Sequence, residues 1–271
     1  MSVHTQTSRM TTSKVRQMKQ SGERIVMLTS YDYTLARLVD EAGVEIILVG
    51  DSASNVVCGN QYTLPITLDE MIFLSKGVVR AAQHALVVVD MPFGSYQISE
   101  EEAVRNAIRI MKESGADAVK LEGGSEILPT IKHLIQVGIP VCGHLGLTPQ
   151  SVNQFGGYGL RAKEDVEAEK LLKDAKHLDE AGCFAIVLEK IPAALASKVT
   201  EAVSAATIGI GAGSGTDGQV LVLHDMLGLN TGFKPKFLRH FAEMADEMKG
   251  AVGAYVSAVK EGSFPNIEEQ Y

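Results

Sequence analysis

IILVGDS, residues 46–52, leads four apolar residues directly into Gly50, Asp51 and Ser52. A short apolar run of this kind predicts a buried strand, so the strand would deliver a carboxylate at its C-terminal end. The same arrangement recurs in LVVVDMP (86–92), AVKLEGG (118–124), PVCGHLG (140–146) and AIVLEK (185–190). Barrels of alternating strands and helices build their active sites from polar residues at such strand ends. The repetition predicts an α/β fold, a (β/α)8 barrel, whose mouth would gather Asp51, Asp90, Glu122, His144 and Glu189.

Strand and helix patterns alternate along almost the whole chain of 271 residues and amount to eight strands, the number that closes a barrel. We expect a single domain over residues 1–271, with a short polar helix at 11–20 that covers the base of the barrel and a helical tail at 237–260. The turn between the last two strands, GAGSGTDG (211–218), is too short for a full helix. An open doubly wound sheet shows the same alternation and is the alternative fold.

The composition excludes several classes of function. Hydrophobic residues make up 45% of the chain and charged residues 21%, as in soluble globular proteins. A formal net charge of −8, with no long cluster of Lys and Arg, argues against a nucleic-acid partner. The glycine-rich GIGAGSGTDG (209–218) does not match a dinucleotide-binding fingerprint and is interpreted as a tight turn.

The cysteines and the N-terminal segment bear on the compartment. Cys58, Cys142 and Cys183 are widely spaced, which predicts reduced, buried thiols and neither a disulfide framework nor a zinc site. No apolar run is long enough to span a membrane and no signal peptide is recognised, so a cytoplasmic location is expected. The first 20 residues are rich in Ser, Thr and basic residues, which leaves a mitochondrial transit peptide as the alternative to a short leading helix.

Three of the acids at the strand ends suggest a metal site. Asp51, Asp90 and Glu122 supply hard oxygen ligands without an accompanying thiolate, which suits Mg²⁺ better than zinc. Each acid alone could simply cap a helix or bond a loop, but their recurrence at equivalent positions favours the metal. Lys120 precedes Glu122 by two residues in a strand, so both side chains face the same side. This lysine could hold a substrate carboxylate or neutralise Glu122.

The remaining polar residues fit acid–base chemistry. Glu189 lies apart from the proposed metal ligands, as a general base would. His144 could bond a substrate oxygen, assist proton transfer or serve only as a hydrogen-bonding strut. Ser52 follows Asp51 directly, and its hydroxyl or amide could meet the substrate.

The chain resembles the ketopantoate hydroxymethyltransferase family almost from end to end. The segments that carry the resemblance are MLTSYDYTLARLVDEAGVEIILVGDS (27–52), NVVCGNQYTLPITLDEM (55–71), VVVDMPFGSY (87–96), AVKLEGG (118–124), PVCGHLGLTPQSVNQFGGYG (140–159), IVLEKIP (186–192) and IGIGAGSGTDGQVLVLHDMLGL (208–229). Such a series in this order is highly specific. The first ten residues take no part in it.

The resemblance implies a barrel of the phosphoenolpyruvate/pyruvate type and an Mg²⁺-dependent transfer of a hydroxymethyl group. The donor would be 5,10-methylenetetrahydrofolate and the acceptor 3-methyl-2-oxobutanoate, which gives ketopantoate for pantothenate synthesis. It also implies a homo-oligomer, commonly a decamer. Matched by motif, the metal ligands are Asp51, Asp90 and, through water, Glu122; the oxo acid contacts are Asp51, Ser52, Asp90, Lys120 and His144; and the base is Glu189.

Two other functions stay open at this point. A lyase or mutase of the same barrel type would cleave or rearrange a small oxo acid at Mg²⁺ without folate. A catalytically silent barrel could bind an oxo acid or serve as an assembly subunit, although the intact acids at all the strand ends argue against it.

Overall fold

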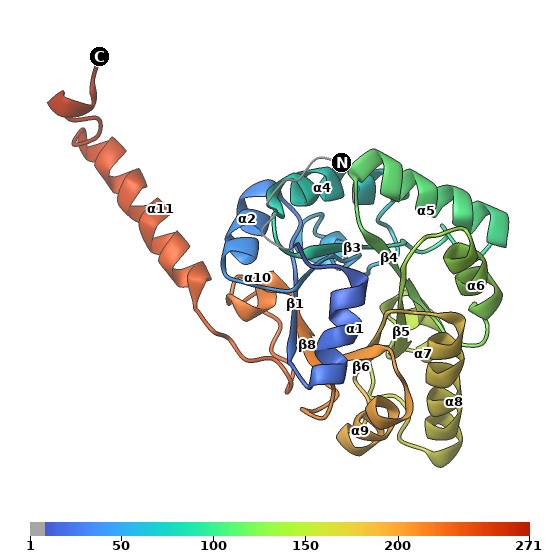
Figure 1. Ribbon diagram of the computed structural model, residues 1–271. Coiled ribbons are helices and arrows are strands. Elements are labelled where there is room, and N and C mark those ends of the chain that lie inside the picture. Colours follow the sequence, from blue (N-terminus) through green and yellow to red (C-terminus); the bar gives the residue numbers. More distant parts are fainter. Residues whose placement is uncertain (1–8) are drawn as a thin grey trace. The chain divides into compact units, whose positions relative to one another are not determined.

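The computed structural model describes residues 9–271 and forms a closed barrel of eight parallel strands in the order β1 to β8 (Figure 1). Closure of the sheet, with β1 paired to β8, confirms the predicted barrel and excludes the open doubly wound sheet. The strands are β1 Ile25–Thr29, β2 Ile46–Val49, β3 Leu86–Asp90, β4 Ala118–Glu122, β5 Val141–Gly146, β6 Ala185–Glu189, β7 Ala206–Ile210 and β8 Gly218–Leu221.

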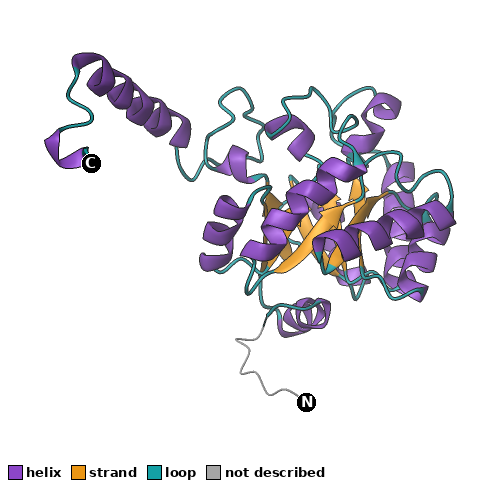
Figure 2. Cartoon of the chain, turned by 90° about the horizontal axis from the view of Figure 1, so that it is seen from above, coloured by secondary structure: helices purple, strands orange, loops and turns teal. Residues whose placement is uncertain are grey.

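Helices surround the strands of the barrel (Figure 2). Those that connect successive strands are α2 Tyr33–Glu41, α3 Ala53–Val56, α4 Leu68–Ala81, α5 Glu100–Ser114, α6 Leu128–Gln136, η1 Pro149–Ser151, α7 Val152–Phe155, α8 Asp165–Ala181 and α9 Ala193–Ala202. As expected from its length, the segment between β7 and β8 holds no helix. The long connection between β2 and α4 begins with the single turn of α3.

Local sequence signals fix where the helices begin. Thr67 and Glu70 form the complete capping box at the start of α4, in which each side chain accepts a hydrogen bond from the other residue's backbone N–H. At the start of α5, the side chain of Ser99 accepts a hydrogen bond from the backbone N–H of Glu102. These caps satisfy N–H groups that a helix leaves unpaired at its first turn.

The barrel interior is filled by alternate residues of the strands. The strand residues in this buried apolar cluster are Ile25, Met27, Ile46, Leu48, Leu86, Val88, Ala118, Cys142, Ala185, Val187, Ala206, Ile208 and Val220. Since side chains alternate between the two faces of a strand, the next inward positions lie at the barrel mouth. The interior therefore confines polar chemistry to the C-terminal ends of the strands.

A helix closes the opposite end of the barrel, as expected. The side chain of Val15 in α1, Thr12–Ser21, is fully buried in the interior cluster. Arg16 donates to the carbonyl groups of residues 182 and 183, just before β6, and Lys19 to those of residues 200 and 205, before β7. Both anchors lie at the N-terminal ends of strands, so α1 covers the base and leaves the mouth free.

The chain divides into two compact units, Met1–Val222 with the barrel and Leu223–Tyr271. The second unit contains α10 Leu223–Met226, α11 Met244–Glu261 and η2 Ile267–Glu269. The predicted helical tail began at residue 237, which is seven residues too early. Residues 237–243 are not helical, because the backbone N–H groups of Phe241 and Met244 bond the carbonyl groups of Met226 and Leu227 and hold the chain in a different path.

The three cysteines are free, as expected, but one of them is not buried. Cys142 and Cys183 lie in the interior, whereas Cys58 is exposed in the loop before α4. Burial raises the pKa of Cys142 to about 12, which keeps this thiol protonated and unreactive. Among residues 9–271, none of the helices has the length and apolar character needed to cross a membrane.

Asp40, in the last turn of α2, fixes the chain that leads into β3. Its carboxylate accepts hydrogen bonds from the backbone N–H groups of Gln83, His84 and Ala85, at 2.9, 3.1 and 2.8 Å. Burial favours the neutral acid, but these bonds and a contact with the His84 ring outweigh burial and lower the pKa of Asp40 below its ordinary value.

We expect Asp40→Asn to lower the free energy of unfolding at pH 7 by about 2–3 kcal/mol, because an amide leaves buried N–H groups unpaired. The folded-state pKa is lowered, so the carboxylate stabilises the fold above its ordinary pKa and loses this effect as the pH falls through the lowered value. The difference from wild type should therefore shrink between pH 7 and about pH 3. Urea unfolding measures it, with the exposed Glu41→Gln of the same helix as control; a difference independent of pH would contradict the assignment.

Candidate active site

The polar residues at the mouth continue the inward-facing pattern of the strands. In β3, Asp90 follows the buried Val88 by two residues, and in β6 Glu189 follows Val187 in the same way. The packed apolar interior ends where these inward-facing side chains change from apolar to charged, and the candidate active site begins there. The other strands contribute Lys120 and Glu122 of β4 and His144 of β5.

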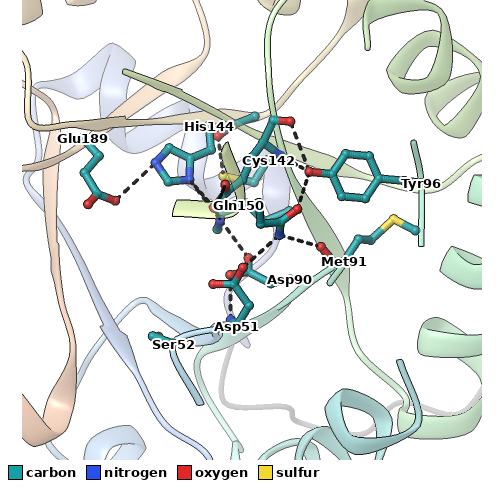
Figure 3. A network of polar contacts seen from close by, with 12 residues as sticks. Asp51, Ser52, Asp90, Met91, Tyr96, Cys142, His144, Gln150 and Glu189 are labelled. Carbon is teal, nitrogen blue, oxygen red and sulfur yellow. Dashed lines mark hydrogen bonds and ion pairs between the residues drawn. The ribbon is translucent and has the colours of Figure 1, made fainter. Parts of the chain in front are cut away.

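Asp51 and Asp90 lie beside each other. Asp51 follows β2 after Gly50, and its backbone N–H donates to Oδ2 of Asp90 at 3.0 Å (Figure 3). A Cβ atom on residue 50 would lie 2.8 Å from Oγ of Ser52, so a larger residue here would displace the Ser52 hydroxyl. The Ser52 hydroxyl is itself 2.8 Å from the hydroxyl of Tyr31. The turn thus places a carboxylate and a hydroxyl together at the mouth.

Lys120 is the cation among these acids. Its Nζ lies 3.0 Å from Oδ1 of Asp90 and 3.6 Å from Oε1 of Glu122, and its side chain is only 4% exposed. Asp90 and Lys120 are partners in the β3–β4 register, and Glu122 is the partner of His144 in β5. The predicted ionic cluster of Lys120 and Glu122 on one face of β4 is confirmed.

His144 connects this cluster to Glu189. Its Nδ1 lies 3.2 Å from Oε1 of Glu122, and its Nε2 lies 3.4 Å from Oε2 of Glu189. The histidine lies within β5, so the strand fixes its position. A Cβ atom on Gly146 would lie 2.3 Å from the carbonyl oxygen of Glu189, and the backbone N–H of Leu147 donates to that oxygen at 2.8 Å. Glycine at 146 therefore allows the end of β5 to lie close to the backbone of Glu189 in β6.

The electrostatics of the site show an excess of negative charge. Burial, and then repulsion by Glu122 and Asp90, raise the pKa of Asp51 well above its ordinary value. Burial also raises the pKa of Asp90, against the attraction of Lys120. For Glu122, burial is outweighed by Lys120 and His144, and the pKa is lowered. The cost of ionising Asp51 and Asp90 together is what a bound cation would remove.

The two basic groups are held in their charged forms. Burial and the nearby Lys120 act to lower the pKa of His144, but Glu122 and Glu189 outweigh them and raise it to about 9. Burial opposes the charge of Lys120 as well, yet Asp90 and Glu122 raise its pKa. The two cations therefore face four acidic side chains, and the charge of a divalent ion would offset the imbalance.

The three acids form a donor set whose chemistry can be compared with the ligands that Mg²⁺ prefers. Asp51, Asp90 and Glu122 offer buried carboxylate oxygens from the ends of three adjacent strands, and such hard ligands suit this ion. Within residues 9–271, no group of three or more His, Cys, Asp or Glu side chains stands ready to enclose a metal ion. In this arrangement Lys120 and Gln150 bond the carboxylate oxygens. The chemistry of the donors fits Mg²⁺, and the metal role of these acids stays a prediction.

The structure brings all the residues that the sequence suggested into one region, and it adds residues that the sequence did not reveal. The additional ones are Gln150 of η1, Tyr96 of the loop before α5 and the carbonyl group of Met91 (Figure 3). Gln150 lies in η1, just beyond the end of β5. A single polar residue beyond the end of a strand belongs to no periodic pattern that predicts burial. The sequence therefore does not indicate that Gln150 is buried in the site.

Solved structures similar to this chain share its fold. A putative phosphonomutase from Burkholderia cenocepacia J2315 has a TM-score of 0.64 at 16% identity, over 82% of this chain and 96% of that chain. A phosphonopyruvate hydrolase, in complex with oxalate and Mg²⁺, has a TM-score of 0.61 at 10% identity, over 96% and 93%. A 2,3-dimethylmalate lyase, described as a member of the PEP mutase/isocitrate lyase superfamily, has a TM-score of 0.56 at 16% identity, over 96% and 90%. Identities this low support the barrel architecture alone.

Sequence comparison defines the family. The family model for ketopantoate hydroxymethyltransferase matches residues 9–267. Proteins named 3-methyl-2-oxobutanoate hydroxymethyltransferase are 61% identical in Bacteroides fragilis, over 98% of this chain and 97% of the relative, and 60% identical in Flavobacterium johnsoniae, over 97% of each. With the site at the barrel mouth and a match over almost its full length, the chain belongs to the ketopantoate hydroxymethyltransferase family.

Proposed function

We propose that this hydroxymethyltransferase moves a hydroxymethyl group from 5,10-methylenetetrahydrofolate to 3-methyl-2-oxobutanoate, with Mg²⁺ as cofactor. The products would be 2-dehydropantoate and tetrahydrofolate, within pantothenate synthesis. Family membership supports the reaction. The observation that carries the proposal for the site is the continuous buried network that joins the three acids, Lys120 and His144 to Glu189.

Mg²⁺ would be held by Asp51 and Asp90, with Glu122 bonding through water. When bound, the ion supplies a Lewis acid that stabilises negative charge on the keto oxygen of the oxo acid. The excess of carboxylates at the mouth supports a divalent ion at this position.

Lys120 and Ser52 would bind and orient the oxo acid. The Lys120 ammonium group is buried and faces the acids, so it can attract the substrate carboxylate into a site that would otherwise repel it. The Ser52 hydroxyl, placed beside Asp51 by the turn after β2, can donate to a substrate oxygen. Held at two points, the substrate would present its C3 atom in a fixed direction.

Glu189 would remove the proton from C3. Its side chain is 16% exposed, against 2% for Glu122 and 3% for Asp90, so among these acids it is more open to a ligand at the mouth. His144, charged at neutral pH, holds the Glu189 carboxylate at 3.4 Å and orients it. The bond between the methylene carbon and N10 of the folate breaks and N10 takes up a proton, which leaves an iminium cation at N5. The C3 carbanion attacks the methylene carbon of this iminium, whose electron pair returns to N5. Water then attacks the same carbon, the bond to N5 breaks, and a proton from the water passes to N5, so that 2-dehydropantoate and tetrahydrofolate are released.

Turnover by the purified protein tests the proposal directly. The assay combines 3-methyl-2-oxobutanoate, Mg²⁺ and 5,10-methylenetetrahydrofolate, and follows 2-dehydropantoate by mass spectrometry. Product that requires all three components supports the proposal. Release of pyruvate or an aldehyde without folate would instead identify a lyase of the same barrel type, and binding without any turnover would identify a silent barrel.

We also propose that the protein acts in the cytoplasm on small molecules as a homo-oligomer, with ten subunits as the expectation from its family. None of the 18 residues of α11 is buried within the chain. Its exposed apolar residues include Met248, Val252, Tyr255, Val256 and Val259. A second copy of the chain would remove this apolar surface from water. Analytical ultracentrifugation tests the assembly, and a monomer at micromolar concentration would exclude it.

A further inference from the structure

Gln150 lies at the centre of the polar network, although it belongs to none of the strands whose C-terminal ends carry the acids. It is the middle residue of η1, in the loop after β5, and is only 5% exposed. Its Nε2 donates to Oδ2 of Asp51 at 2.8 Å and to the carbonyl oxygen of Met91 at 3.0 Å. Its Oε1 accepts from the hydroxyl of Tyr96 at 2.7 Å and from Nε2 of Gln97 at 3.3 Å (Figure 3). Both donors and both acceptor positions of the amide are therefore used.

These partners permit only one orientation of the amide. With the amide turned over, its oxygen would face the carboxylate of Asp51 and the carbonyl of Met91, two acceptors. The Tyr96 hydroxyl accepts from the backbone N–H of Glu122 at 3.2 Å, and its one proton can reach Oε1 of Gln150 at 2.7 Å or the carbonyl oxygen of Glu122 at 3.2 Å. The shorter distance favours the bond to Gln150, which supports the observed orientation of the amide. The tyrosine is 2% exposed, so its ring is fixed by packing.

The backbone of Gln150 holds a second acid. Its N–H donates to Oε2 of Glu122 at 2.9 Å, while its side chain bonds Asp51. One residue thus bonds two of the three acids proposed to bind Mg²⁺. An amide orients a carboxylate without cancelling its charge, whereas Lys120 orients Asp90 with a charge that competes with a cation. A neutral donor is the chemistry that a cation site requires around its ligands.

We propose that Gln150 is a positioning residue, which fixes Asp51 and Glu122 in the orientation that binds Mg²⁺, and that Tyr96 in turn fixes the amide of Gln150. The inference rests on the proposed function, because it assumes that these acids hold the ion. Neither Gln150 nor Tyr96 contacts the reacting atoms in this account. Their removal should therefore alter the dependence on metal more than the rate of the loaded enzyme.

Two substitutions test the inference by calorimetric titration of the metal-free protein with Mg²⁺. Gln150→Met keeps the approximate length of the side chain and the backbone N–H, but it removes both side-chain N–H donors. It should raise the Kd for Mg²⁺ about 10–100-fold. Tyr96→Phe removes one hydroxyl and keeps the ring, and it should also raise the Kd for Mg²⁺, by a smaller factor. Gln154→Met, an exposed change in the neighbouring helix α7, is the matched control and should bind Mg²⁺ as wild type does.

Kinetics add a second readout. For both variants the Mg²⁺ concentration at half-maximal rate should rise, and the rate at saturating Mg²⁺ should return to within a few-fold of wild type. If Gln150→Met folds and binds Mg²⁺ with wild-type affinity, the inference is overturned while the proposed function stands. If that variant does not fold, wild-type Mg²⁺ affinity in Tyr96→Phe has the same consequence. Failure of the wild-type protein to bind Mg²⁺ would overturn both.

Discussion

Replacing Glu189 by glutamine is expected to lower kcat by about 10²–10⁴-fold, the range that a general base contributes. The amide keeps the size of the side chain and can still accept a hydrogen bond from His144, which lies 3.4 Å away in the wild type. It cannot take a proton from C3 of the substrate. Because Glu189 contributes no ligand to the proposed Mg²⁺, binding of the metal and of the oxo acid should change little.

Steady-state kinetics and titration of the oxo acid into the Mg²⁺-loaded protein separate these two effects. Glu201→Gln, an exposed change on α9, serves as the control and should behave as wild type. Turnover of Glu189→Gln within a few-fold of wild type would rule out this residue as the base. A loss of oxo acid binding equal to the loss of rate would instead assign it to substrate binding.

Replacing Asp90 by asparagine is expected to raise the Kd for Mg²⁺ by more than about 100-fold, beyond the effect of losing an outer partner of a metal ligand. The change removes one negative charge from the donor set. It also gives the side chain an NH₂ group, which must face either Lys120 or the backbone N–H of Asp51, both of them donors that lie 3.0 Å from the carboxylate. Metal binding and the supporting hydrogen bonds are therefore damaged together.

The same calorimetric titration with Mg²⁺ measures this effect, with turnover at increasing Mg²⁺ as a second readout. Asp69→Asn is the matched control, because Asp69 is an exposed acid of α4 whose carboxylate bonds Arg109, outside the site. Mg²⁺ affinity in Asp90→Asn equal to that of the control would show that Asp90 is not a ligand.

The barrel and its charged mouth could be predicted because both follow from short-range patterns. Five of the apolar strands carry a charged residue or a histidine at or next to their C-terminal ends, and the two-residue period of a strand places Lys120 and Glu122 on one face, where the structure has them in contact. The start of α11 could not be predicted, because it depends on backbone hydrogen bonds between residues 241–244 and 226–227 that no local pattern announces. The exposure of Cys58 was missed for the same reason, since burial is a tertiary property.

The positions of the acids could be predicted from the sequence, but the means of holding them could not. Gln150 and Asp51 are 99 positions apart and come from loops that follow different strands. Their contact depends on the closure of the sheet, which brings β2 to β5 around one axis. The orientation of Gln150 depends in turn on Tyr96, from a third connection. The barrel topology brings these residues of three different connections together, so their contacts can be seen only in the folded chain.

The central claim is that Glu189 and the acids of the mouth together remove the C3 proton of 3-methyl-2-oxobutanoate. Proton NMR in D₂O, with Mg²⁺ and with tetrahydrofolate present in place of the methylene donor, follows the exchange of that proton for deuterium. We expect exchange by the wild-type protein that stops when Mg²⁺ is chelated and is almost absent in Glu189→Gln. Equal exchange in Glu189→Gln, or none in the wild type under conditions where the oxo acid is bound, would contradict it.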